Sequence, residues 1–293
     1  MADFRARDDG AHVVVTGTST GIGAASALLL AELGFRVFAG VRSDADGEAL
    51  VERASGRLTP ISIEITDEES IAAAAETVTS AVGGRGLFGL VNNAGIVRPG
   101  PLELQALPEF RHHLEVNLVG PVAMIQAFLP LIRLGRGRIV NVGSIGGRLA
   151  LPLHGAYSAS KFGMEAVSDA LRLELRQWRI PVSHVDPGAT QTPIFDKTLA
   201  AIDELEKSLR SRNRSEYVEQ ISGVRRLIES TAADAAPVDE LAKTVAKALT
   251  ADKPKSRYRA GHGATGAVLL ARMATDGVKD RAVVYEAKLS SPG

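Results

Sequence analysis

The chain of 293 residues lacks cysteine, net charge and any unbroken apolar run of about 18 residues. The absence of cysteine excludes disulfides and thiolate metal sites. The balance of 34 basic and 34 acidic residues argues against a nucleic-acid or membrane-surface binder. The six histidines show no zinc-binding spacing, and the N-terminus has no apolar signal segment. We therefore expect a cytoplasmic protein with no membrane anchor and no metal.

Short apolar runs alternate with helical patterns along the chain. The expected strands are 12–16, 36–41, 58–65, 86–91, 138–142, 182–185 and 257–261. This alternation predicts right-handed crossovers and a doubly wound parallel sheet of the Rossmann type, with residues 1–293 as a single domain. In such a sheet, ligands bind at the carboxyl ends of the strands.

A glycine-rich turn, Gly17-Thr-Ser-Thr-Gly-Ile-Gly23, follows the first expected strand and precedes a helix. Glycines allow a tight turn and a close approach of the backbone to a pyrophosphate, and a helix N-terminus favours an anion. The spacing differs from the Gly-x-Gly-x-x-Gly fingerprint. Its place between a strand and a helix nevertheless favours nucleotide binding over a plain turn.

Arg42 follows the second expected strand, about where dinucleotide-binding folds place a ribose-binding acid. An acid would accept a hydrogen bond from a ribose 2′-hydroxyl, whereas an arginine pairs with a 2′-phosphate. Arg42 therefore predicts NADP in preference to NAD. The alternative is a solvated arginine at a strand end.

The stretch 139–161 contains a candidate acid/base site. Tyr157 and Lys161 are four residues apart and share one face of an expected helix, 156–178. Ser144 follows the strand 138–142 at the ligand-binding edge. A nearby ammonium would lower the pKa of the phenol, which is about 10 in free tyrosine. The serine hydroxyl would hold a substrate oxygen while the phenol exchanges a proton with it. The alternative is a buried tyrosine beside an exposed lysine, a pair that also occurs by chance.

Taken together, the motifs of residues 11–262 resemble those of the short-chain dehydrogenases/reductases. In chain order they are Thr16-Gly-x-x-x-Gly-Ile-Gly23, Asn92-Asn-Ala-Gly95, Asn117, Ser144, Tyr157-x-x-x-Lys161 and Pro187-Gly-x-x-x-Thr192. The resemblance implies that Tyr157 is the catalytic acid/base and that Ser144 orients the substrate oxygen. It also implies that Lys161 holds the nicotinamide ribose and that Asn117 supports a water in a proton relay to Lys161.

The resemblance assigns a further set of residues to the cofactor. They are Gly17, Ser19, Thr20, Gly21, Ile22, Gly23, Arg42, Glu64, Ile65, Asn93, Ala94, Gly95, Pro187, Gly188, Thr190 and Thr192, together with Tyr157 and Lys161. Glu64 stands where the family more often has an aspartate near the adenine. The family also commonly forms dimers or tetramers through its long helices, so we expect a homodimer or homotetramer. Small residues at Ala159, Gly163, Ala166 and Ala170 would let another helix approach closely.

Three segments, 147–157, 162–172 and 255–261, look like the retinol dehydrogenase and 17β-hydroxysteroid dehydrogenase branch of that family. We therefore expect an NADP(H)-dependent oxidoreductase that interconverts an alcohol and its ketone or aldehyde on an apolar, steroid- or retinoid-like small molecule. One alternative is a 3-oxoacyl thioester reductase. Another, from a different class, is a non-catalytic dinucleotide sensor on the same fold.

Residues 193–236 differ from the rest of the chain because they are dense in charge yet amphipathic. One apolar stripe consists of Leu199, Ile202, Leu205 and Leu209, and a second of Tyr217, Ile221, Val224 and Ile228. Both have helical spacing and predict a helical insertion over the cleft. We expect a mobile lid whose first stripe closes on the substrate. The alternative is a helix packed permanently on the core or on a partner subunit.

Overall fold

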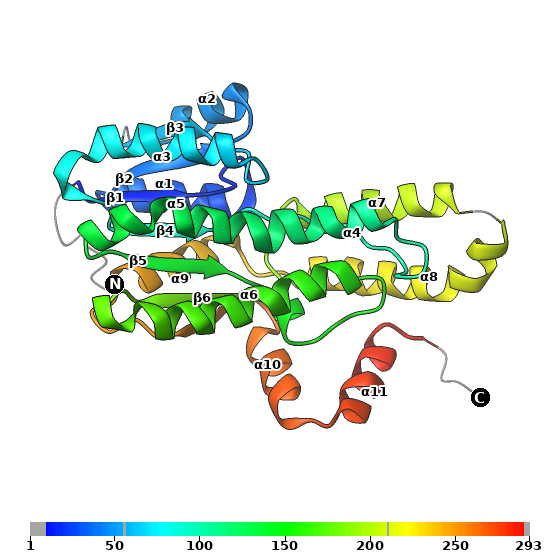
Figure 1. Cartoon of the computed structure of the whole chain (residues 1–293). Helices are drawn as coiled ribbons and strands as arrows, with labels where there is room; N and C mark the ends of the chain where they lie inside the picture. The colour runs from blue at the N-terminus through cyan, green and yellow to red at the C-terminus, as the bar shows by residue number, and fades with distance from the viewer. Residues whose placement is uncertain (1–9, 55–56, 210, 290–293) are drawn as a thin grey trace.

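The computed structural model describes residues 10–54, 57–209 and 211–289. Across these residues, parallel strands form one sheet in the order β3-β2-β1-β4-β5-β6-β7 (Figure 1). The strands are β1 (His12–Val15), β2 (Arg36–Val41), β3 (Leu58–Ser62), β4 (Gly89–Asn92), β5 (Arg138–Val142), β6 (Val182–Pro187) and β7 (Arg257–Ala260). The order reverses at β1, which pairs with β2 on one side and β4 on the other. A doubly wound sheet binds ligands at this switch point.

Helices cover both faces of the sheet. The α-helices of the described residues are α1 (Gly21–Glu32), α2 (Asp44–Glu52), α3 (Glu68–Val82), α4 (Leu107–Leu114), α5 (Gly120–Leu134), α6 (Gly155–Glu174), α7 (Ile194–Ser208), α8 (Ser211–Ala233), α9 (Val238–Thr250), α10 (Ala264–Met273) and α11 (Asp276–Glu286). Helices α1 and α9 pack on one face, and α3 and α5 on the other. Successive side chains of a strand point to opposite faces: in β1, Val13 and Val15 pack against α1 and α9, whereas Val14 packs on the side of α3 and α5. Both faces are buried, as a parallel sheet requires.

Two predicted strands differ from the structure by three residues at one end, and three others by one or two residues. The run 86–91 begins as a strand only at Gly89, because the chain still turns at Gly86, where φ is +70°. The run 58–65 ends as a strand at Ser62, although the N–H of Ile63 still donates to the carbonyl of Val41 at 2.9 Å. The chain then turns toward the Asp67 cap of α3.

The helical stretch Leu107–Leu134 is long and apolar enough, by length and composition, to cross a membrane. Polar residues such as Glu115 and Asn117 interrupt this stretch, so it contains no unbroken apolar run of about 18 residues. Half of its most apolar 18-residue segment is buried inside the protein. Met124, Phe128 and Ile132 belong to the core between the sheet and helices α3 and α5. Core helices of folded domains pass the same test, so the finding is weak evidence for a membrane span.

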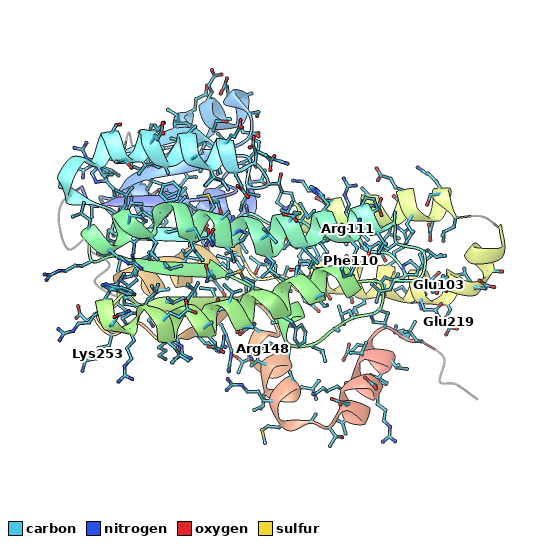
Figure 2. The ribbon with its side chains drawn as sticks, viewed as in Figure 1. Glu103, Phe110, Arg111, Arg148, Glu219 and Lys253 are labelled. Atoms are coloured by element: carbon cyan, nitrogen blue, oxygen red, sulfur yellow. The ribbon has the colours of Figure 1, made fainter. Side chains whose placement is uncertain are left out.

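Helices α7 and α8 form a hairpin that projects beyond the sheet (Figure 1). Their two apolar stripes pack on each other and on Leu153, with Ile202, Ile221 and Val224 almost fully buried. The expectation that the α7 stripe closes on substrate is therefore wrong, because α8 already covers it. At the side of the hairpin, Tyr217 donates a 2.5 Å hydrogen bond to Glu103, which Figure 2 shows beside α8.

The C-terminal segment, for which the sequence indicated no element, contains α11. The chain after it packs against α8: a Cβ added to Gly223 would lie 2.6 Å from the carbonyl oxygen of Ala287. Ala287 is fully buried. The C-terminal residues up to 289 thus contact helix α8 of the hairpin.

Candidate active site

The turn between β1 and α1 contains Gly17, Ser19 and Thr20, and α1 begins with Gly21, Ile22 and Gly23, three residues earlier than the glycine motif suggested. Gly17 has φ +67°, a conformation that costs glycine little. A Cβ on Gly23 would lie 2.2 Å from the carbonyl oxygen of Gly17 and 2.4 Å from Nδ2 of Asn93. Only glycine fits there, because the turn folds back tightly against the first turn of α1, and a helix N-terminus favours an anion.

Asn93 ties this turn to the end of β4. Its Nδ2 donates to the carbonyl oxygens of Thr16 at 3.0 Å and Gly17 at 3.1 Å. In return, Thr16 Oγ1 accepts from the backbone N–H groups of Asn93 at 3.0 Å and Ala94 at 3.1 Å. Sequence reasoning gave Thr16 no role of its own. The one feature of the sequence that could have indicated a role for Thr16 is its position directly before Gly17, at the start of the glycine motif.

The predicted adenine-side residues lie at the ends of β2 and β3. Arg42 is exposed directly after β2. Glu64 is half-buried and its Oε1 accepts from the backbone N–H of Thr66 at 3.2 Å and from its hydroxyl at 2.9 Å. The Ile65 side chain is buried in the core, so a cofactor contact at this position would use the backbone.

The segment Pro187–Thr192 leaves β6 beside the glycine turn. A Cβ on Gly21 would lie 3.3 Å from Cβ of Thr192. Thr190 is buried, and its hydroxyl donates to the carbonyl of Gly188 at 3.0 Å. The glycine turn, expected to hold the pyrophosphate, and the segment Pro187–Thr192, also assigned to the cofactor, therefore lie side by side.

Ser144, Tyr157 and Lys161 come together at the carboxyl end of β5. Ser144 caps the short 3₁₀ helix η3 (Ile145–Gly147) by accepting from the N–H of Gly146 at 3.0 Å. A Cβ on Gly146 would lie 3.3 Å from Ser144 Oγ and 3.0 Å from Cε1 of Tyr157. Lys161 is buried, and its Nζ donates to the carbonyl of Val142 at 3.2 Å. The expected phenol, ammonium and hydroxyl thus share one site.

The electrostatics of this site differ from the expectation. Burial raises the pKa of Tyr157, and its hydrogen bond with Ser144 acts in the opposite direction. Burial lowers the pKa of Lys161 to about 8. The expected depression of the Tyr157 pKa is therefore wrong for this arrangement, because desolvation of the phenolate outweighs the hydrogen bond with Ser144. At neutral pH the phenol keeps its proton.

Asn117 lies in a π-helical turn, η2 (Glu115–Val119), between α4 and α5. Its Oδ1 accepts from the N–H of Ile96 at 2.8 Å, and its Nδ2 donates to the carbonyl of Ile96 at 2.9 Å and to Ser160 Oγ at 3.1 Å. A Cβ on Gly95 would lie 3.2 Å from Asn117 Oδ1 and 3.6 Å from Lys161 Nζ. Asn117 is therefore placed close to Lys161, and π-turns of this kind occur frequently at functional sites.

An apolar pocket of about 160 Å³ opens on the Tyr157–Ser144 side. Its walls come from the Ser144 turn, the start of α6, and the inner faces of α7 and α8. The lining residues are Val97, Ser144, Ile145, Gly146, Leu151, His154, Tyr157, Ser158, Ile194, Phe195, Thr198, Leu227, Ile228 and Thr231. Sequence reasoning placed the insertion over the cleft but did not identify Ile194, Phe195 or Leu227.

His154 is a polar group in this apolar wall. Its Nδ1 lies 3.1 Å from the carbonyl of Pro152, which accepts only, so Nδ1 carries the hydrogen. Burial lowers the pKa of His154, which keeps the ring neutral. Its Nε2 is then a hydrogen-bond acceptor, and the ring packs edge-on to Tyr157 with centroids 6.3 Å apart.

Comparison with known proteins agrees with this geometry. Residues 11–203 match the family described as short chain dehydrogenase. Retinol dehydrogenase 5 of Mus musculus is 36% identical over 258 residues, covering 86% of this chain and 80% of the relative. The 17-beta-hydroxysteroid dehydrogenase type 6 of Bos taurus is 36% identical over 268 residues, covering 88% and 84%.

Solved structures show the same fold. A short-chain dehydrogenase from Streptomyces avermitilis superposes with a TM-score of 0.77 at 27% identity, covering 97% of both chains. One from Burkholderia cenocepacia, in complex with NADP, has a TM-score of 0.68 at 27% identity and covers 97% of this chain and 99% of its own. With matched motifs, fold and relatives, the chain belongs to the short-chain dehydrogenase family of CH–OH oxidoreductases, on the branch that includes retinol and 17β-hydroxysteroid dehydrogenases.

Proposed function

We propose that the protein is an NADP(H)-dependent enzyme that interconverts an alcohol and its carbonyl compound on an apolar substrate. The observation that carries the proposal is the meeting of Ser144, Tyr157 and Lys161 at the mouth of an apolar pocket. The residues present fit a dinucleotide, since glycine at position 23 lets the Gly17 turn and Asn93 pack closely at the N-terminus of α1, where backbone N–H groups favour a phosphate.

A bound nicotinamide supplies or accepts the hydride. The chain's own residues then handle the substrate oxygen. Ser144 orients that oxygen by a hydrogen bond, and Tyr157, neutral at pH 7, donates its proton to the oxygen during carbonyl reduction. Lys161 and Asn117 lie behind Tyr157, in position to stabilise the phenolate that remains and to return a proton to it.

The choice of NADP rests on Arg42. Its exposed side chain follows β2, where a 2′-phosphate would approach, and an arginine can pair with such a phosphate through two hydrogen bonds. Two solved structures of similar sequence, from Burkholderia cenocepacia at 27% identity and from a metagenomic source at 28%, hold NADP.

The apolar walls of the pocket favour an apolar substrate, and similar relatives are named for retinol and 17-beta-hydroxysteroids. The pocket's 160 Å³ is below the range of about 300 Å³ or more usual for ligand pockets. A bulky substrate would therefore require α7 and α8 to move outward. This supports the proposal that the hairpin is a mobile lid, with Phe195 and Leu227 as its inner surface.

His154 refines the substrate class. As a neutral acceptor in an apolar wall, it favours a substrate with a hydroxyl or N–H group away from the reacting carbon.

A 3-oxoacyl thioester reductase remains the alternative enzyme, and a non-catalytic dinucleotide sensor the alternative from another class. The Ser144–Tyr157–Lys161 arrangement disfavours the sensor, because binding a dinucleotide does not require an acid/base pair facing a pocket.

The test is NADPH oxidation monitored by absorbance with matched panels of hydroxysteroid ketones, retinal and 3-oxoacyl thioesters. We expect turnover of the first two groups, faster with NADPH than with NADH. Turnover of thioesters alone would replace the proposed substrate class. Tight NADPH binding without oxidation of any substrate would favour the sensor.

A further inference from the structure

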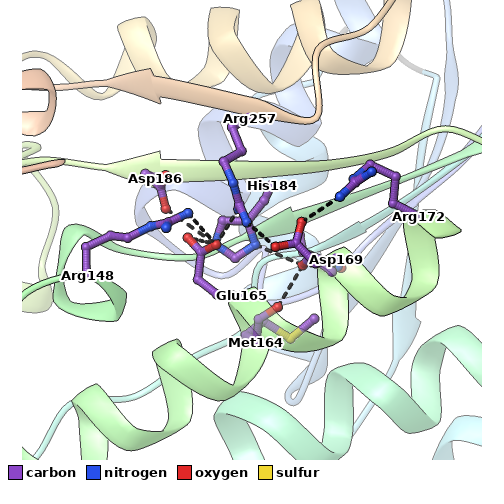
Figure 3. A network of polar contacts seen from close by, with 10 residues as sticks. Arg148, Met164, Glu165, Asp169, Arg172, His184, Asp186 and Arg257 are labelled. Carbon is purple, nitrogen blue, oxygen red and sulfur yellow. Dashed lines mark hydrogen bonds and ion pairs between the residues drawn. The ribbon is translucent and has the colours of Figure 1, made fainter. Parts of the chain in front are cut away.

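Behind the Ser144 turn lies a buried group of charged and titratable side chains (Figure 3). We call Glu165, His184 and Asp186 the buried triad; their side chains are 9%, 1% and 0% exposed. Arg148 and Arg257 flank it, and both contact Oε2 of Glu165, with Arg148 at 2.5 Å. The proposed proton and hydride transfers use none of these residues.

Ser168 fixes which nitrogen of His184 carries a hydrogen. Its Oγ lies 2.7 Å from the carbonyl oxygen of Met164, and two oxygens that close need a hydrogen between them, which only the hydroxyl can supply. Ser168 therefore accepts from Nδ1 of His184 at 2.9 Å, and also from Nδ2 of Asn141 at 3.0 Å. In the neutral ring, Nδ1 carries the hydrogen and Nε2 presents a lone pair.

That lone pair faces two carboxylates. Nε2 of His184 lies 3.2 Å from Oε1 of Glu165 and 3.4 Å from Oδ1 of Asp186. Among the residues that the structure describes, no hydrogen-bond partner is found for any of these three buried atoms. Three acceptors at such distances repel one another in a buried site unless a hydrogen lies between them. The triad therefore needs one more proton than a neutral histidine and two carboxylates provide.

Glu165 is the best holder of that proton. Burial raises its pKa to about 7, with Asp186 acting in the same direction. Burial also lowers the pKa of His184; Asp186 acts in the opposite direction, but Arg257 and Lys161 reinforce the lowering. The pKa of Asp186 is lowered despite its burial, because its neighbours His184, Glu165 and Arg148 favour its carboxylate.

A divalent cation is the competing occupant, since the triad offers three ligand atoms within 4.8 Å of one another. The flanking charges argue against it. Arg148 and Arg257 already balance the two carboxylates, so a cation would bury two uncompensated positive charges. A single proton adds only one positive charge, and it would form a hydrogen bond between the Glu165 carboxyl group and the lone pair of His184 Nε2.

Each member of the group borders a segment of the candidate active site. Arg148 directly follows the short helix η3, and Ser144 directly precedes it. A Cβ on Gly143 would lie 2.0 Å from Nε2 of His184, so the ring packs directly against the residue before Ser144. Glu165 lies one turn after Lys161 on α6, and Asp186 directly precedes Pro187 on β6.

We propose that Glu165 is a positioning residue that holds a buried proton between itself, His184 and Asp186. This proton-bridged triad fixes the Ser144 turn, the Tyr157–Lys161 helix and the Pro187 turn relative to one another. When the proton is lost, two carboxylates and a lone pair face one another and the three segments separate slightly. The proposal rests on the proposed function only for its kinetic readout.

The sign of the pH effect follows from the direction of the shift. The folded pKa of Glu165, about 7, lies above the ordinary value of 4.5. The folded state therefore holds more protons between these two values, and its stability falls as pH rises through that window. The stabilisation is complete below 4.5 and is lost once the pH exceeds 7.

The first test measures the proton itself without substrate. Infrared difference spectra of the whole protein at about pH 5.5 and about pH 8.5 should show the carbonyl band of a buried carboxylic acid at the lower pH only. Glu165→Gln should remove that band, and Asp169→Asn should keep it. Asp169 is a fair control because it lies one turn further along α6 and also binds Arg257, but outside the triad. Absence of the band in the parent protein overturns the proposal.

The second test compares Glu165→Gln with Glu165→Leu. The glutamine amide can donate to His184 as the protonated acid does, and its oxygen can accept from Arg148 and Arg257. We expect it to keep kcat within about threefold, with weaker pH dependence of both unfolding and kcat between about pH 5 and 8. Glu165→Leu should lower kcat by about tenfold or more and change KM less.

Equal losses in both variants would show a packing role alone and overturn the proposal. Elemental analysis of the purified protein that found one equivalent of a divalent metal, absent from His184→Ala, would replace the proton with a cation. If the parent protein turned over no carbonyl substrate, the proposed function would fail. The infrared and unfolding measurements would still decide the triad.

Discussion

Nζ of Lys161 lies 5.8 Å from the ring centroid of Tyr157 and donates its hydrogen bond to the backbone of β5. The ammonium therefore faces the aromatic ring, which attracts it through the ring quadrupole. Since burial raises the pKa of the phenol and lowers that of the amine, both groups favour their neutral forms. A neutral phenol is the form that donates a proton, which suits carbonyl reduction near neutral pH.

Tyr157→Phe should remove the transferable proton while keeping the ring. We expect kcat to fall by about 10²-fold or more, because a positioned general acid contributes about that much. NADPH binding, measured by fluorescence titration, should change little. Turnover close to that of the parent protein would contradict the assignment of Tyr157 as the acid/base.

Lys161→Met should abolish activity and yet raise stability. The folded pKa of Lys161, about 8, is depressed from 10.5, so at neutral pH the folded state bears the cost of a buried charge. Removing that cost, less the lost hydrogen bond to Val142, should raise the free energy of unfolding by about 2 kcal/mol at pH 7. Urea unfolding at about pH 7 and about pH 10 checks this, since the difference between parent and variant should shrink at the higher pH. A variant less stable than the parent at both pH values would argue that Lys161 is held mainly by its contacts.

Arg42→Ala should weaken NADPH binding by about 10- to 100-fold, because a charge-assisted contact contributes about 1.5–3 kcal/mol. NADH binding should be nearly unchanged. Arg36→Ala is the matched control, since Arg36 is an exposed arginine at the opposite end of the same strand. Equal affinity of the parent protein for the two cofactors would count against a 2′-phosphate site at Arg42.

Leu227→Asp should raise KM for a bulky apolar carbonyl substrate by about tenfold or more, because the charge would face the pocket. Thermal stability should fall little, since Leu227 lies outside the packed α7–α8 stripes. Val218→Asp, at a site 53% exposed on the same helix, should change neither quantity. Ile221→Asp should unfold the hairpin, because Ile221 is buried between the helices.

Hydrogen exchange then separates a lid from a fixed hairpin. If the hairpin is mobile, NADP together with substrate should slow exchange in α7 and α8. Equal protection with and without ligands would show that the hairpin is a fixed wall of the pocket.

Light scattering at micromolar concentration should give the mass of a dimer or tetramer. Ala166 and Ala170 are exposed on α6 and could contact a second chain. Gly163 does not share that role, because a Cβ there would lie 2.8 Å from Leu118 of the same chain. Ala166→Arg should therefore dissociate the oligomer, whereas a parent protein with the mass of one chain would rule out this assembly.

The sequence alone determined those features that depend on neighbours along the chain. Short apolar runs that alternate with helical patterns specified the parallel sheet, because a strand buried on both faces consists almost entirely of apolar residues. The glycine motif 17–23 between strand and helix and the shared helix of Tyr157 and Lys161 are local too, and the structure has both, although α1 already begins at Gly21. The helical periodicity of 193–236 likewise predicted α7 and α8.

Only the tertiary structure decided what those elements face. The apolar stripe of α7 packs on α8 and not on substrate. The helical periodicity could not show this, because it marks an apolar face without indicating which apolar surface covers it. The direction of the Tyr157 pKa depends on how much water the fold excludes. Glu165, His184 and Asp186 carry no motif, and Glu165 meets the other two only because α6 crosses behind β6. Burial and proximity between distant residues are properties of the packed chain, so no local pattern records them.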